Sequence, residues 1–217
     1  MPKTHIYFMP GLGVGPEIFK KLTLSPEYEL HYLEWKKPLS QEETLVNYAM
    51  RIAADVTHEN PVLIGVSFGG ILAQEMSKFI DTKKLIIISS VKSKNEFPKR
   101  FKFANASNIY KLFPTSIITN FDDYSKFFIG KYLRKKAENY KRYLTVKDKT
   151  YIEWSIHNVL NWKQELPPKN ILHIHGTKDN VFPIKYIHNC TEIIDGDHAI
   201  IILKAKKISE IINNYLN

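Results

Sequence analysis

The sequence has 217 residues, of which 44% are hydrophobic and 24% are charged. A chain of this length and apolar content can bury a full core, which excludes the disordered and fibrous classes. No apolar run approaches the ~20 residues that span a bilayer, and the N-terminus lacks a signal-peptide pattern, so we expect a soluble, cytoplasmic protein with no membrane span. The single cysteine, Cys190, excludes a disulfide framework and a cysteine-based zinc site.

The formal net charge is +9, but the basic residues are 27 lysines and only 4 arginines. Nucleic-acid sites favour arginine for bidentate contacts, so this bias indicates an AT-rich coding sequence more than a nucleic-acid partner, and we expect none. The charge is also uneven: residues 83–149 hold 17 basic against 5 acidic side chains, a net of +12. This segment therefore differs from the rest of the chain.

Short apolar, β-branched runs alternate with helical patterns along most of the chain. Strands are expected at residues 5–9, 29–33, 62–66, 85–89, 171–175 and 191–194, and helices at 16–22, 41–57, 69–80, 183–188 and 199–215. Ser40 and Glu43 have the spacing of a capping box at the start of the second helix. Runs without polar alternation, such as residues 85–88, are typical of parallel strands that are covered on both faces. The fold class is therefore α/β.

The alternation stops between residues 91 and 165, where helices are expected near 97–105, 116–128, 131–143 and 149–162. This segment holds 15 of the 27 aromatic residues. We interpret residues 91–165 as a helical cap inserted into a core formed by residues 1–90 and 166–217.

Ser67 is the candidate nucleophile. It lies in Gly65-Val66-Ser67-Phe68-Gly69, between an expected strand and an expected helix. Glycines two residues before and two after a serine give room for a sharp strand-to-helix turn, which exposes the hydroxyl at the end of the sheet. The same spacing also arises by chance in loops, but this strand-turn-helix context favours the functional interpretation.

A serine nucleophile needs a base and an acid that orients the base. His198 follows the last expected strand, and Asp179 is the only carboxylate just beyond the end of the strand before it. Asp179 is also typical of a turn, and Asp197 adjoins His198 but points away from it. His173 and His175 face the same way on a strand, yet no third ligand accompanies them, so we expect no metal.

Two backbone amides are candidates for an oxyanion hole, those of Phe68 and of Leu12. Leu12 lies in the loop Met9-Pro10-Gly11-Leu12-Gly13 after the first strand. The loop also resembles a dinucleotide-binding fingerprint, but Pro16 stands where that fingerprint requires its third glycine.

The order Ser67, Asp179, His198 and the motifs around these residues resemble the α/β-hydrolase superfamily. The resemblance spans nearly the whole chain; it departs from the common form at Pro10, where a histidine is usual. It implies a mostly parallel sheet of about six strands, flanked by helices, with the cap at 91–165. It also implies cleavage of an ester or thioester of a small-molecule substrate through an acyl-enzyme, without a cofactor.

The substrate stays open at this stage, because the same fold also hosts C–C bond hydrolases, lyases and ligand receptors. The aromatic cap either binds an apolar or aromatic group or forms its own core. Its lysines either attract an anionic substrate or form a solvated face. The sequence leaves the oligomeric state open.

Overall fold

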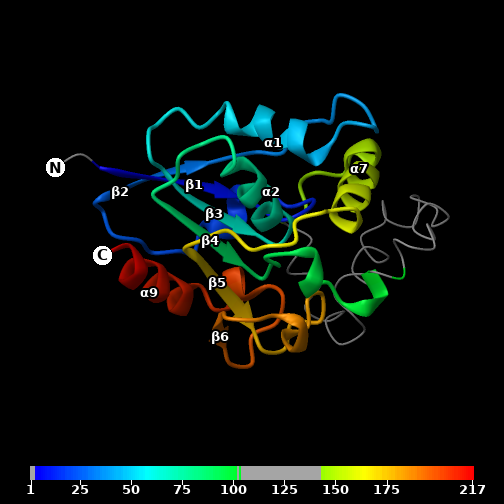
Figure 1. Cartoon of the computed structure of the whole chain (residues 1–217). Coiled ribbons are helices and arrows are strands. Elements are labelled where there is room, and N and C mark those ends of the chain that lie inside the picture. The colour runs from blue at the N-terminus through cyan, green and yellow to red at the C-terminus, as the bar shows by residue number, and fades with distance from the viewer. Residues whose placement is uncertain (1–2, 102, 104–142) are drawn as a thin grey trace.

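The computed structural model describes residues 3–101, 103 and 143–217. A six-stranded sheet with the order β2-β1-β3-β4-β5-β6 forms its centre, and every neighbouring pair is parallel (Figure 1). The strands are β1 (Thr4–Met9), β2 (Tyr28–Tyr32), β3 (Val62–Val66), β4 (Lys84–Ile88), β5 (Ile171–Gly176) and β6 (Thr191–Ile193). The α/β fold class is therefore confirmed. The first and last residues of each strand lie within one position of those expected from the sequence.

The helices cover both faces of the sheet (Figure 1). They are η1 (Pro16–Phe19), α1 (Leu45–Ala53), α2 (Phe68–Met76), η2 (Lys94–Glu96), α7 (Lys149–Leu160), η5 (Ile184–Tyr186), α8 (Ile200–Leu203) and α9 (Ala205–Leu216). Two apolar clusters separate the layers: one contains residues of α1, α2 and α7, and the other contains residues of η1, α8 and α9. Successive strand residues alternate between them, so that Ile6 and Phe8 pack on the α9 side while Tyr7 and Met9 pack on the α1 side.

Helix α1 begins four residues later than the capping box predicts. Thr44 is its N-cap, and the Thr44 hydroxyl accepts a hydrogen bond from the Asn47 amide at 3.2 Å. The carboxylate of Glu43 instead accepts from the Leu39 amide and from the Arg51 guanidinium, both at 2.7 Å. The prediction was wrong because the buried ion pair with Arg51 uses the side chain that a capping box needs.

Other helices are shorter than expected. The segments at 16–22 and 183–188 form only single 3-10 turns, and the expected C-terminal helix is divided at Lys204 into α8 and α9. The helices expected at 116–128 and 131–143, and part of that at 97–105, lie outside the described residues apart from Tyr143.

Helix α7 packs directly on the core through Trp154. The Trp154 ring lies 4.3 Å from that of Tyr48 in α1, and its indole N–H donates to the Glu43 carbonyl at 2.7 Å. Both rings are fully buried. The described end of the 91–165 segment is therefore joined to the sheet layers by apolar contact and a hydrogen bond.

No helix among the described residues has both the length and the apolar character needed to cross a membrane.

We predict that Trp154→Ala lowers the free energy of unfolding by about 3–5 kcal/mol, because it leaves a large cavity between α7 and α1. Leu166, which is 81% exposed, gives the control: Leu166→Ala is expected to change it by less than about 0.5 kcal/mol. Denaturant unfolding measures both variants. Equal stabilities would show that α7 contributes nothing to the core.

Candidate active site

Ser67 occupies a strained turn between β3 and α2. Its backbone φ is 53° and its ψ is −121°, a backbone conformation that residues with a Cβ rarely adopt. The Ser67 amide donates to the Ile88 carbonyl at 2.9 Å, and the Ser90 hydroxyl donates to the Ser67 carbonyl at 2.7 Å. These two bonds hold the turn against the end of β4.

The flanking glycines permit the turn by removing side chains where backbones meet. A Cβ added to Gly65 would lie 2.3 Å from the Gly69 carbonyl oxygen. A Cβ added to Gly69 would lie 2.2 Å from the Pro10 carbonyl oxygen at the end of β1. The spacing of the two glycines around Ser67 is therefore a steric requirement of this backbone path.

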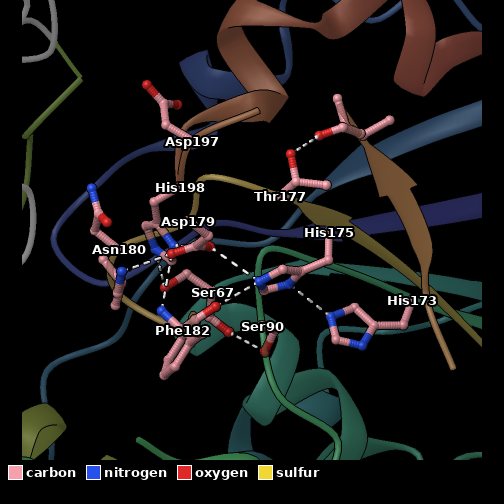
Figure 2. Close-up of polar contacts among 12 residues, drawn as sticks. Ser67, Ser90, His173, His175, Thr177, Asp179, Asn180, Phe182, Asp197 and His198 are labelled. Atoms are coloured by element: carbon pink, nitrogen blue, oxygen red, sulfur yellow. Dashed lines mark hydrogen bonds and ion pairs between the residues drawn. The ribbon is translucent and has the colours of Figure 1, made fainter. Parts of the chain in front are cut away.

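The structure brings the three predicted side chains into one hydrogen-bonded chain (Figure 2). His198 Nε2 lies 2.9 Å from Ser67 Oγ, and His198 Nδ1 lies 2.8 Å from Asp179 Oδ2. Asp179 follows β5, and His198 follows β6, so parallel strands deliver both side chains to the same edge of the sheet as Ser67. His198 is 19 positions from Asp179 and 131 positions from Ser67 in the sequence.

Asp179 is a buried carboxylate whose charge is compensated. Its Oδ1 accepts from the Val181 and Phe182 amides at 2.7 and 2.9 Å. Burial by itself raises the pKa of Asp179, but the adjacent His198 imidazole and its hydrogen bond outweigh burial, and the net pKa lies below the ordinary value. The carboxylate is therefore ionised at neutral pH and fixes the orientation of the His198 ring.

Two buried histidines extend this chain behind Asp179 (Figure 2). His175 Nε2 lies 2.8 Å from the Phe182 carbonyl and 3.5 Å from Asp179 Oδ2, while His175 Nδ1 lies 3.1 Å from His173 Nε2. Burial lowers the pKa of His175 and places that of His173 well below the ordinary value. Both rings are therefore neutral at pH 7 and bond to each other.

Arg100 supports the Asp179 loop, and its sequence context gave no signal of this. The guanidinium donates to the Asn180 carbonyl at 2.5 Å and to the Val181 carbonyl at 2.7 Å.

Asp197, the other carboxylate near His198 in the sequence, lies apart from the Asp179 carboxylate (Figure 2), and its side chain accepts from the Ala199 amide at 2.9 Å. The preference for Asp179 over Asp197 agrees with this geometry.

The loop that carries Leu12 lies against Ser67. A Cβ added to Gly11 would meet the Ser67 Cβ at 3.5 Å, an ordinary contact distance. The Gly11 carbonyl accepts from the Trp35 indole at 2.8 Å, and the Trp35 ring stacks on Phe68 at 5.0 Å. Phe68 is the first residue of α2, so its amide lies at a helix N-terminus. Both predicted oxyanion donors therefore belong to backbone next to Ser67.

An apolar cavity of about 140 Å³ adjoins Ser67 and His198. Residues of the core and of the described part of 91–165 line it together. They include Leu12, Val14, Ile18, Phe68, Phe101, Tyr143, Leu144, Ile156, Val159, Leu160, Val181, Phe182, Ile201 and Ile202. Ser67 and His198 thus open onto a space that suits an apolar group.

We predict that Gly69→Ala lowers the free energy of unfolding by about 3 kcal/mol, because its Cβ would overlap the backbone of β1. Gly11→Ala is the matched control, since its Cβ meets nothing closer than 3.5 Å, and a loss under about 0.5 kcal/mol is expected. Denaturant unfolding measures both. Similar losses would contradict the steric account of the turn.

The buried histidines predict a pH dependence of stability. Below the ordinary histidine pKa the unfolded chain takes up protons at His173 and His175 that the folded chain does not, so the free energy of unfolding falls as pH falls. We expect this fall across the range from about pH 7.5 to 5.5, where a histidine with its ordinary pKa takes up a proton. His173→Leu is expected to reduce this slope, and an unchanged slope would contradict the assignment.

The sequence matches no protein-family model and no curated protein. Solved structures do match it along nearly its full length. The enol-lactonase from Burkholderia xenovorans LB400 has a TM-score of 0.70 at 11% identity, covering 99% of this chain and 91% of that one. A lipase-esterase related protein from Clostridium acetobutylicum ATCC 824 has 0.68 at 19%, with 98% and 94% covered. The bromoperoxidase from Bacillus anthracis has 0.67 at 15%, with 99% and 92% covered. These structures are α/β-hydrolase fold members, and the chain has the α/β-hydrolase fold.

Proposed function

We propose that this protein is a serine hydrolase that cleaves a carboxylic ester or thioester with an apolar acyl or aromatic group. The observation that carries the proposal is the Ser67–His198–Asp179 hydrogen-bonded chain, at 2.9 and 2.8 Å, beside an apolar cavity. A serine with a strained backbone can have a purely structural role. A serine that also contacts an oriented imidazole and an open cavity fits nucleophilic catalysis.

In the proposed reaction, Ser67 Oγ attacks the substrate carbonyl while His198 Nε2 accepts the serine proton. Asp179 stabilises the imidazolium that forms. The tetrahedral intermediate then collapses, the bond to the leaving group breaks, and His198 returns the proton to the leaving oxygen or sulfur. Water, deprotonated by His198, attacks the acyl-enzyme in the same way and releases the acid and free Ser67.

The Leu12 and Phe68 amides are proposed to stabilise the oxyanion in both steps. The position of Phe68 at the start of α2 supports its part, since helix N-termini carry partial positive charge. For Leu12 the support is the closeness of its loop to Ser67, since a Cβ added to the neighbouring Gly11 would lie 3.5 Å from the Ser67 Cβ. No residue of this scheme needs a cofactor or a metal.

We also propose that residues 91–165 form a cap over the site. Phe101, Tyr143, Ile156 and Val159 of this segment line the cavity together with core residues, which supports the assignment. The aromatic and aliphatic lining favours an apolar acyl group. The names of two structural neighbours, a lipase-esterase related protein and an enol-lactonase, are compatible with ester chemistry.

The described basic side chains of residues 83–149 give little support to an anionic substrate. Arg100 binds backbone carbonyls, buried Lys92 pairs with Glu96 at 3.7 Å, and Lys94 pairs with Glu165 at 2.5 Å. Of the 17 basic residues in this segment, 9 lie outside the described residues. We therefore propose a neutral acyl ester as the first substrate class to test, with acyl-CoA thioesters in the same panel.

We predict that Ser67→Ala lowers kcat/KM for p-nitrophenyl esters by roughly 10⁴-fold or more, because the nucleophile is removed from a concerted unit. A fluorophosphonate probe is expected to label the wild type once, at Ser67, and not the variant. Thermal melting is the control for folding. Labelling of another serine, or retained turnover in folded Ser67→Ala, would refute the assignment.

The same panel separates the enzyme from a ligand receptor with this fold. A receptor would show a ligand-dependent rise in melting temperature without turnover of any ester or thioester. That outcome would refute the hydrolase proposal.

We predict that Val159→Phe, which fills part of the cavity, lowers kcat/KM for p-nitrophenyl butyrate by about tenfold and leaves the acetate ester nearly unchanged. Val46→Phe is the matched control, because Val46 is 45% exposed on α1 and lies outside the cavity lining. Steady-state kinetics measure both esters. Equal effects on butyrate and acetate would contradict an acyl group in this cavity.

A further inference from the structure

Three histidines that the sequence gave no reason to connect meet on the α1 side of the sheet. His5 comes from β1, His31 from β2, and His58 from the loop between α1 and β3. One ring nitrogen from each lies within 4.8 Å of the others, and all three side chains are partly exposed. In the described part of the chain, no other group of three or more histidine, cysteine or acidic side chains is placed to share an ion.

The separation of the first two nitrogens fits a shared ligand. His5 Nδ1 lies 3.0 Å from His31 Nε2. Two imidazoles on one Zn²⁺ with bonds of ~2.0–2.1 Å place their nitrogens about 3.4 Å apart at a tetrahedral angle. The same separation also fits an N–H···N hydrogen bond. An ion can therefore replace a shared proton with a small movement of these two side chains.

His58 has an oxygen partner of the kind that orients metal-bound histidines. Its Nδ1 lies 2.6 Å from the Tyr7 hydroxyl oxygen, which also accepts from the Thr57 amide at 3.2 Å. When the His58 Nδ1–H donates to Tyr7, His58 Nε2 keeps its lone pair. A histidine ligand usually donates its second N–H to an oxygen in this way.

One adjustment is needed for all three rings to bind the same ion. The His5 and His58 rings are stacked, with centroids 3.5 Å apart and planes at 10°, so their lone pairs run side by side. The His58 ring has to tilt. His58 lies on a loop of residues 54–61, between α1 and β3, whose neighbouring residues Glu59 and Asn60 are exposed.

The cluster is separate from the proposed catalytic site. His5 precedes Ile6, which pairs with Val62 at the start of β3, whereas Ser67 follows the end of that strand. His5 is level with position 61, so at ~3.3 Å per strand residue the two sites are about 20 Å apart along the sheet. A hollow lined by Tyr7, His31 and Thr57 adjoins the cluster and gives an ion a route from solvent.

We propose that His5, His31 and His58 bind one divalent transition-metal ion for which imidazole is a preferred ligand, with Zn²⁺ as the first choice and Ni²⁺ and Co²⁺ as probes. Tyr7 is a positioning residue for His58. Solvent supplies the remaining ligands. The ion would join the edge strand β2 to β1 and to the 54–61 loop, and it takes no part in the proposed hydrolysis.

The test is titration of the untagged, full-length protein with Zn²⁺ by calorimetry, and with Co²⁺ by visible absorption followed by displacement with Zn²⁺. We expect one ion per chain, a Co²⁺ spectrum of low coordination number, and a rise in melting temperature with Zn²⁺. His31→Gln and His58→Gln are each expected to weaken binding by about tenfold or more, and Tyr7→Phe by about tenfold.

His188→Gln is the matched control, because His188 is exposed and distant in sequence from the cluster, and it is expected to leave binding unchanged. Millimolar affinity in the wild type, or undiminished binding in both His31→Gln and His58→Gln, would overturn the proposal. If one variant does not fold, the other variant and the wild-type Co²⁺ spectrum still decide. Ser67→Ala distinguishes this site from the catalytic one, since its metal affinity is expected to equal that of the wild type.

Discussion

The candidate site depends on one close approach of backbones, where the ends of β1 and β3 meet the start of α2. No Cβ fits at Gly65 or Gly69, and the backbone between them turns through the strained conformation of Ser67. Strain of this kind persists only when surrounding contacts outweigh it. Here the parallel ladders of the sheet and the packing of α2 supply those contacts, and they also set the level at which β5 and β6 present Asp179 and His198.

The electrostatics follow from this placement. A buried carboxylate is costly unless hydrogen bonds and an opposite charge compensate it, and Asp179 has two amides and the His198 ring for that purpose. Neutral His175 lies 3.5 Å from the Asp179 carboxylate, and the cavity beside Ser67 and His198 is lined mostly by apolar residues. A low-dielectric surrounding strengthens each of these interactions, and the same condition would strengthen the proposed stabilisation of an oxyanion by the Leu12 and Phe68 amides.

The features that were predictable from the sequence are those that a short local pattern determines. Apolar runs located the six strands of the described residues, and the glycine spacing located Ser67, because one backbone turn needs that spacing. Interactions between distant residues were not predictable: Arg100 meets the Asp179 loop across 80 positions, and His5 meets His31 across 26. The start of α1 was misplaced because the Glu43 carboxylate accepts a hydrogen bond from Arg51. That contact depends on the packing of the folded chain, so the local capping pattern does not predict it.

In the proposed reaction, Ser67 carries the acyl group during turnover. Mass spectrometry can detect this acyl group after the protein is mixed with p-nitrophenyl butyrate, quenched with acid at successive times and digested. We predict a butyryl group on the peptide that contains Ser67, appearing together with a burst of about one p-nitrophenol per chain when deacylation is the slower step. Release of p-nitrophenol with the acyl group on another side chain, or with no acylated peptide at any quench time, would contradict it.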